Sequence, residues 1–202
     1  MIRKALLFIA AVAAAATTLS HPAGATTLSY STGLANPAVV LDFSGLQDGS
    51  TVGAAYAAQG VTFGGLFVSS QLGNTLSPTT APAAVNFQGN TTNATFTISF
   101  TTVVHDAAFF LYTDGFGTTI TSSLAGTQVE TVNAGTYQNS GADFFGFTAS
   151  SFDLITIVVA RSGNAVIDNV EIGQAQVPEP ASAALLLMGL TGIAASRRRR
   201  TL

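Results

Sequence analysis

The segment from residue 94 to residue 101 reads Ala94-Thr95-Phe96-Thr97-Ile98-Ser99-Phe100-Thr101. Its large apolar side chains occupy every second position, and small hydroxyl side chains lie between them. A period of two is the pattern of a β-strand that has one face on a core and the other in water. The segment therefore predicts a sheet that is covered by apolar residues on one side.

Similar short segments, rich in Thr, Val, Ile and Phe and separated by Gly, Asn, Ser and Pro, occur on both sides of this strand. Ala125-Gly126 has the composition of a tight hairpin turn, and Ala54 to Gln59 is the one short helix or helical turn that we expect. This series of short strands predicts an all-β domain, a two-sheet antiparallel β-sandwich of jelly-roll type. The predicted strands are Ala38–Phe43, Val61–Val68, Ala84–Gln88, Ala94–Thr101, Ala107–Tyr112, Thr118–Leu124, Thr127–Val132, Asp143–Thr148, Leu154–Ala160 and Ala165–Ile172.

The N-terminal residues 1–25 have the three parts of a secretory signal peptide. Arg3 and Lys4 are positively charged, an apolar run extends from Ala5 to Ala16, and Ala23-Gly24-Ala25 provides the small residues of a cleavage site. The apolar run is too short to span a bilayer permanently. We therefore expect an exported chain whose mature form begins at Thr26 and whose domain occupies residues 26–177.

The C-terminal residues contain a second targeting pattern. Val177-Pro178-Glu179-Pro180 precedes an uncharged, Ala- and Leu-rich run from Ala181 to Ser196, which Arg197, Arg198, Arg199 and Arg200 follow. Prolines do not continue a helix, whereas the run favours one. At about 1.5 Å per residue the run spans roughly 24 Å, and the arginines can reach the headgroups. We predict a single transmembrane helix over 181–196 with the arginines on the cytoplasmic side.

Pro-Glu-Pro, a short apolar helix and a terminal arginine cluster, in this order, resemble the PEP-CTERM sorting signal of exported bacterial proteins. The resemblance assigns residues 178–202 to the signal. It implies an integral membrane protease-transpeptidase of the exosortase type as the partner, which processes the chain near the motif. The expected location is a tether at the inner membrane before processing and the cell surface or extracellular space afterwards.

The charge of residues 26–177 excludes one large class of functions. Arg161 is the only Lys or Arg in this range, against nine Asp and Glu residues, so the net charge is about −8. Such a domain cannot neutralise a phosphate backbone, and nucleic-acid binding is excluded. The chain has no cysteine, which excludes thiol catalysis and thiolate metal sites.

Candidate catalytic residues are few. His105 is the only histidine after the signal peptide, and a Ser-His-Asp triad would have to use it beside Asp106. No Gly-x-Ser-x-Gly motif accompanies it, so an exposed histidine at a strand end is the better interpretation. Glycosidase chemistry needs two carboxylates across a cleft, but no acidic pair lies in a motif, and most acidic residues should be solvated surface charges. We therefore predict no enzyme activity.

Asp168 is the one carboxylate whose position calls for an explanation. Strict alternation over Ala165–Ile172 would place Val166, Asp168, Val170 and Ile172 on one face. An aspartate among apolar residues must be paired, hydrogen-bonded or bound to a metal. Backbone N–H groups at a β-bulge are the simpler solution, and a structural calcium ion is the alternative, because this chain offers hard oxygen ligands.

A second, looser resemblance covers residues 38–173. Leu41-Asp42-Phe43-Ser44-Gly45-Leu46, Gly60-Val61-Thr62-Phe63 and Ala165-Val166-Ile167-Asp168-Asn169-Val170 resemble the ectodomain common among PEP-CTERM proteins. They are also similar to carbohydrate-binding and galactose-binding-like jelly rolls. Some of these are implied to hold calcium between their first and last strands, which would make Asp42 a partner of Asp168.

The resemblances together predict a non-enzymatic surface or matrix protein that is associated with extracellular polysaccharide. The residues leave two alternatives open, a carbohydrate-binding module and a hydrolase with an unrecognised carboxylate site. Absence of Trp counts against a sugar-binding face. Most phenylalanines, among them Phe43, Phe63, Phe96, Phe100, Phe109 and Phe147, are expected in the core.

Overall fold

The computed structural model describes residues 26–71, 79–114, 117–135 and 143–173. The predicted signal peptide, the sorting motif and the apolar segment 181–196 lie outside these residues. In the described part of the chain, no helix is long and apolar enough to cross a membrane.

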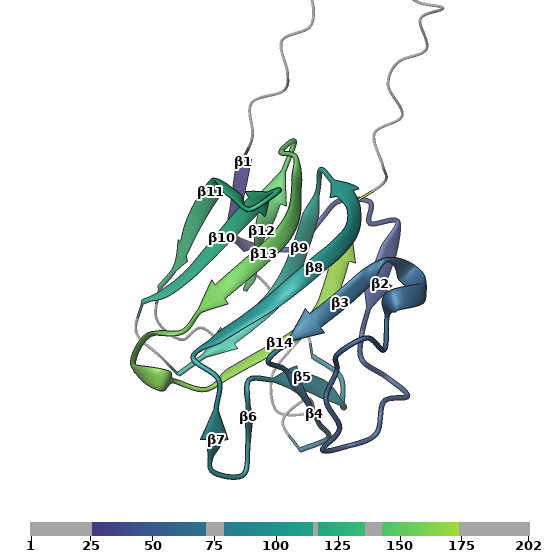
Figure 1. Cartoon of the computed structure of the whole chain (residues 1–202), viewed down its shortest axis with the longest axis vertical. Coiled ribbons are helices and arrows are strands. Elements are labelled where there is room, and N and C mark those ends of the chain that lie inside the picture. The colour runs from purple at the N-terminus through teal and green to yellow at the C-terminus, as the bar shows by residue number, and fades with distance from the viewer. Residues whose placement is uncertain (1–25, 72–78, 115–116, 136–142, 174–202) are drawn as a thin grey trace, which may run out of the picture.

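Two antiparallel sheets form the domain and lie one behind the other (Figure 1). The seven-stranded sheet has the order β1-β12-β9-β14-β5-β4, with β2 also paired to β14. Its strands are β1 (Thr26–Ser31), β2 (Val39–Leu41), β4 (Phe67–Ser69), β5 (Ala83–Val85), β9 (Ala107–Thr113), β12 (Phe144–Thr148) and β14 (Ala165–Ile172). The five-stranded sheet, in the order β11-β10-β13-β8-β3, contains β3 (Val61–Gly64), β8 (Thr95–Val104), β10 (Thr118–Leu124), β11 (Thr127–Ala134) and β13 (Phe152–Val158). A small hairpin, β6 (Phe87–Gln88) and β7 (Thr91–Thr92), extends from the sandwich.

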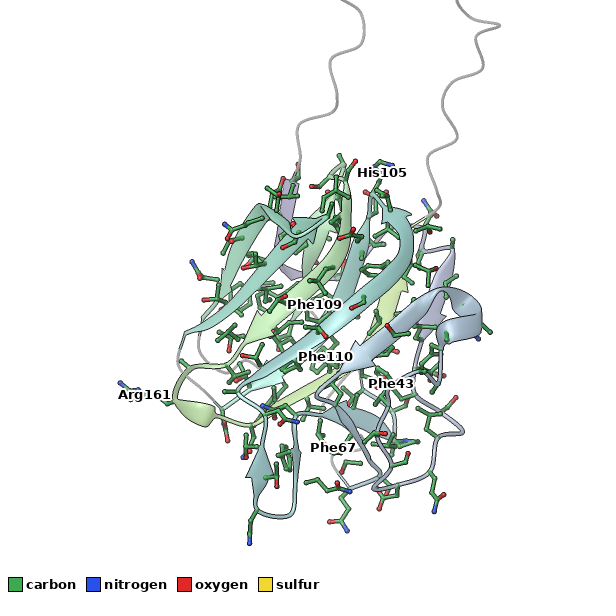
Figure 2. All side chains as sticks on the ribbon, in the orientation of Figure 1. Phe43, Phe67, His105, Phe109, Phe110 and Arg161 are labelled. Atoms are coloured by element: carbon green, nitrogen blue, oxygen red, sulfur yellow. The ribbon has the colours of Figure 1, made fainter. Side chains whose placement is uncertain are left out.

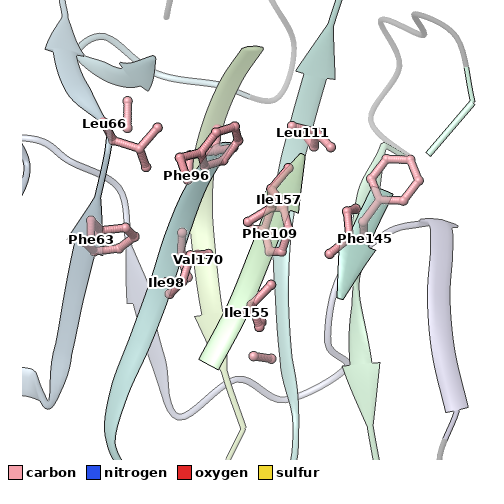
Figure 3. Close-up of a cluster of buried hydrophobic side chains, with 14 of the residues drawn as sticks. Phe63, Leu66, Phe96, Ile98, Phe109, Leu111, Phe145, Ile155, Ile157 and Val170 are labelled. Atoms are coloured by element: carbon pink, nitrogen blue, oxygen red, sulfur yellow. The ribbon is translucent and has the colours of Figure 1, made fainter. Parts of the chain in front are cut away.

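The hydrophobic core lies between the two sheets. Phe96, Ile98, Ile155 and Ile157 come from the five-stranded sheet, and Phe109, Leu111, Phe145 and Val170 come from the seven-stranded sheet (Figure 3). All six phenylalanines that we expected in the core are buried there. Because burying one such side chain contributes roughly 1.5–3 kcal/mol, this layer supplies most of the stabilisation of a domain without disulfides.

The alternating residues 95–101 lie in a β-strand with one face in the core, as predicted. Phe96, Ile98 and Phe100 of β8 are buried in the core, whereas the residues between them are half-buried on the other face. The hairpin at Ala125-Gly126 is also confirmed, because both residues have positive φ values, as a tight turn between β10 and β11 requires. The expected helical turn is a 3-10 helix, η1 (Ala57–Gln59).

Two predicted strands are wrong as single elements. Val61–Val68 is β3 in one sheet and β4 in the other, because Gly65 has a φ of +75° and redirects the chain between them. Ala84–Gln88 is likewise β5 and then β6 of the separate hairpin, interrupted at the buried Asn86. Asn86 donates to the carbonyls of Asn93 and Gly163 and accepts the N–H of Ala165, so it fixes three segments instead of continuing a strand.

The predicted face of β14 is also wrong. Ala165 and Ile167 face the core between the sheets, and so do Val170 and Ile172, which shifts the alternation by one residue. The register with β9 changes between Asp168 and Glu171, and Asn169 has a φ of +47°. A β-bulge at this point inserts the extra residue. Val166 therefore faces away from the core that contains Val170, in a second apolar cluster on the outer side of the seven-stranded sheet.

Candidate functional site

Asp168 lies at the bulge of β14 and is completely buried. Its Oδ2 accepts the backbone N–H of Thr80 at 2.9 Å, and its Oδ1 accepts the backbone N–H of Asn169 at 2.8 Å. Backbone donors at a bulge, the simpler of the two expected solutions, satisfy this carboxylate. Thr80 could not be identified from the sequence, because it is distant along the chain and carries no motif.

Burial raises the pKa of Asp168 from 3.8 to about 7, because water no longer stabilises its charge. The hydrogen bonds from Thr80 and Asn169 act in the opposite direction, and the negative charge of Asp42 raises the pKa further. At neutral pH this carboxyl group is therefore divided between its protonated and ionised forms. A shifted, buried carboxylate with a second carboxylate in electrostatic reach is the most distinctive chemical feature of the described residues.

Asp42, which follows β2, is half-buried, and its Oδ1 accepts the N–H of Ser44 at 3.0 Å and the hydroxyl of Ser44 at 2.8 Å. Tyr56 lies in the same region, with its ring packed edge-on against Phe43 and Phe63. Burial raises the pKa of the Tyr56 hydroxyl, and the charges of Asp42 and Asp168 raise it further. The structure thus brings the two proposed calcium ligands, Asp42 and Asp168, within electrostatic reach of each other and adds Tyr56.

The oxygen chemistry of this site suits a hard cation such as calcium. Among the residues that the structure describes, however, no three His, Cys, Asp or Glu side chains gather as a metal site. A calcium ion held by Asp42 and Asp168 would therefore need backbone carbonyls or water as its other ligands. Calcium binding stays a prediction, and its chemical role would be to neutralise the negative charges of the buried Asp168 and the half-buried Asp42, which otherwise repel each other.

His105 lies in the turn between β8 and β9 and is half-buried, not exposed as we expected. Its Nδ1 is 3.2 Å from the hydroxyl of Ser151, which belongs to the loop between β12 and β13. Asp106 accepts the backbone N–H of Ala149 in that loop at 2.8 Å. These contacts join two turns at one end of the sandwich. The sequence did not reveal Ser151, because nothing in its neighbourhood marks it as a partner.

The expectation that most acidic residues are solvated surface charges is wrong. In the described part of the mature range only Asp48 and Asp114 are exposed. Several carboxylates accept backbone N–H groups of distant segments: Asp114 binds Asn164, Asp153 binds Ala125, and Glu171 binds Leu34. A domain with almost no basic residues thus uses its carboxylates to satisfy loop backbone donors.

Comparison with known proteins identifies the C-terminal segment. Residues 176–200 match the PEP-CTERM protein-sorting motif, which includes the predicted Val177-Pro178-Glu179-Pro180 and Arg197 to Arg200. The chain therefore carries the sorting signal of an exported protein that is processed by exosortase and is anchored at the membrane before processing. No curated protein matches the chain.

A solved structure that resembles the chain is a mutant of the carbohydrate-binding module CBM29-2, from a study of ligand recognition by family 29 modules. The sequences are 16% identical, and the match covers 77% of this chain and 98% of the module, with a TM-score of 0.35. With so low a TM-score, nothing about a ligand follows for this chain.

Proposed function

We propose that this chain is a non-enzymatic surface or matrix protein whose sandwich domain is exported, processed at both ends and associated with extracellular polysaccharide. The observation that carries the proposal is the sorting motif at residues 176–200, which begins three residues after the described domain ends at Gly173. A domain joined this closely to a sorting signal is the cargo that the signal delivers.

The connectivity supports a jelly roll as the form of this sandwich. From β8 to β14 the chain moves repeatedly between the sheets, with β8, β10, β11 and β13 in one and β9, β12 and β14 in the other. Strands that alternate between two packed sheets are typical of Greek-key and jelly-roll folds. Such folds serve many functions, so the sorting motif and not the fold carries the functional argument.

Processing at both ends is a testable consequence. We expect the surface or secreted form to begin at Thr26 and to lack the segment from about Ala181 onward, since each end carries a cleavable signal. Intact-mass analysis of that form measures both ends at once. Neutral replacements of Arg197 to Arg200 should impair processing because the cytoplasmic charge bias is lost. A surface form that retains the arginines would contradict this prediction.

Carbohydrate binding is a second candidate, which one observation favours. The β-sheet register aligns Phe67, Val85, Val166 and Tyr112 in one row across β4, β5, β14 and β9. This row lies on the outer face, and the rings of Phe67 and Tyr112 are partly exposed at its two ends. With strands ~4.8 Å apart, the two rings are separated by roughly 14 Å. Val85 and Val166 between them are buried, so the two partly exposed rings at the ends of the row are the surfaces on which sugar rings can stack.

Affinity electrophoresis in gels that contain soluble bacterial polysaccharides tests this candidate. Loss of a stacking ring costs about 1–3 kcal/mol in nucleic-acid-binding proteins, so Tyr112→Ala should weaken binding by about tenfold. Val158→Ala is the control, because Val158 is exposed on the other sheet. Binding that Tyr112→Ala leaves unchanged would exclude this face as the site.

A further inference from the structure

Both ends of the described chain leave the sandwich at the same end. Thr27 of β1, next to Thr26, pairs with Phe147, Phe147 pairs with Ala107, and Ala107 pairs with Ile172, so these residues form one row across four strands. Gly173, the last described residue, donates its N–H to the carbonyl of Asp106 at 2.8 Å. We call this end, with the turn of His105, the terminal end of the domain (Figure 2).

The opposite end, which we call the distal end, contains the β6–β7 hairpin and the short helix η2 (Ala160–Ser162). Thr95, at the start of β8, pairs with Val158, and Arg161 follows shortly after. Figure 2 shows His105 at the top of the domain and Arg161 at its left edge in the lower half. The strand β8 has 10 residues and runs between the two ends, which gives a separation of roughly 33 Å at ~3.3 Å per residue.

The connection from the domain to the predicted membrane segment is short. Only residues 174–180 separate Gly173 from Ala181, and they include Pro178 and Pro180. Fully extended, such a segment spans at most ~25 Å. The connection is therefore shorter than the sandwich. A domain attached by it cannot turn over freely so that the distal end faces the membrane in place of the terminal end.

We propose that the terminal end lies against the lipid surface before processing and that the distal end projects away from it. This inference rests on the proposed sorting function, because it requires the C-terminal segment to be in the membrane. Among the exposed large apolar side chains of the described residues, Val40, Val103 and Val129 lie towards the terminal end, where the headgroup region can accommodate them, whereas Val158 lies at the distal end. Arg161, the only Lys or Arg between residues 26 and 177, lies at the distal end, so the short connection and not charge attraction orients the domain.

Single-cysteine labelling tests the orientation directly, because the natural chain contains no cysteine. The exposed residues Thr102, near the terminal end, and Asn90, in the β6–β7 turn, give the matched variants Thr102→Cys and Asn90→Cys. Each full-length, unprocessed variant is labelled with a fluorophore and reconstituted in vesicles that carry spin-labelled headgroups in both leaflets. We expect several-fold stronger quenching at position 102 than at position 90. Equal quenching, or stronger quenching at position 90, would overturn the orientation.

Two further measurements distinguish a failure of the proposed membrane stage from a failure of the proposed orientation. Flotation of the vesicles shows whether the chain is anchored, and a chain that does not float with them would overturn the proposed membrane stage and this inference together. Insertion of about twenty Gly and Ser residues after Gly173 adds a flexible segment whose extended reach of roughly 70 Å exceeds the length of the sandwich. The difference in quenching should then decrease, and a difference that is unaffected by the insertion would contradict the role of the connection.

Discussion

Replacement of Gly146 by alanine should prevent the domain from folding. Gly146 lies in β12, between its partners Leu28 of β1 and Ala108 of β9. A Cβ atom at this position would meet the carbonyl oxygen of Ala107 and would lie 2.7 Å from the Cα of Ala108. Both contacts are with backbone, which cannot rotate away, so β12 and β9 would have to separate. The buried rings of Phe145 and Phe147 would then lose their packing, at a cost above the ~1–3 kcal/mol of ordinary overpacking.

Circular dichroism and thermal melting of the mature chain measure this effect. The matched control is Gly126→Ala, where a Cβ atom would have nothing within 4 Å but φ is +80°. That variant should lose only about 1–2 kcal/mol, the cost of the left-handed conformation for a residue with a side chain. A Gly146→Ala domain that melts cooperatively, within a few degrees of the natural one, would show that the strands can adjust.

In a buffer with chelator, the stability of the domain should fall as the pH rises from about 4 to about 8. The pKa of Asp168 is raised from 3.8 to about 7 in the folded state, so between these values the folded state binds more protons than the unfolded state. Stability is therefore highest while Asp168 is protonated and decreases until the pH passes the folded pKa. At 1.36 kcal/mol per unit, the whole decrease is on the order of 4 kcal/mol.

Denaturant titrations across this pH range test the prediction with the variant Asp168→Asn. An asparagine keeps one acceptor for the N–H of Asn169 but loses the hydrogen bond from Thr80, which costs about 1 kcal/mol. Because an asparagine cannot ionise, the stability of the variant domain should vary much less with pH. Glu171→Gln is the control, because burial also raises the pKa of Glu171 and its own contribution must be separated. A pH profile that Asp168→Asn leaves unchanged would assign the decrease to other groups.

The same titration decides the calcium prediction. A cation bound by Asp168 and Asp42 would stabilise the ionised carboxylates, so millimolar calcium should remove the decrease at high pH and raise the melting temperature by mass action. Asp168→Ala should abolish that rise. A chelator-treated domain that melts at the same temperature with and without calcium would exclude the ion and leave the backbone hydrogen bonds as the complete explanation.

Local patterns in the sequence correctly predict those elements that depend only on neighbouring residues. The alternation of Phe96, Ile98 and Phe100 predicts β8 and its buried face, and Ala125-Gly126 predicts the hairpin, because neighbouring residues determine both. The run Val61–Val68 has the apolar character of one strand, and only the +75° φ of Gly65 shows that it enters two sheets. The strands β1 and β7, which were not predicted, are polar and stay ordered through pairing with distant or adjacent strands.

In the candidate site, too, the sequence predicts local features but not the contacts between distant segments. The expected alternation over Ala165–Ile172 predicts that Asp168 lies among apolar residues and needs either backbone donors at a bulge or a calcium ion. The identity of its donor, Thr80, depends on how β5 and β14 meet in space, which no local pattern contains. The same is true of Ser151 beside His105, since the two turns are brought together by the pairing of β8 with β13 and of β9 with β12.

The position of β14 determines how the domain would carry mechanical load. β14 is the strand that leads to the C-terminal attachment, and it is paired with β9 on one side and with β2 and β5 on the other. A pull on that attachment must shear both rows of hydrogen bonds together, whereas β1, at the sheet edge, is held by β12 alone among the described strands. A protein held at its C-terminus against fluid drag would therefore transmit force through a strand that is paired on both sides and leave the edge strand β1 unloaded.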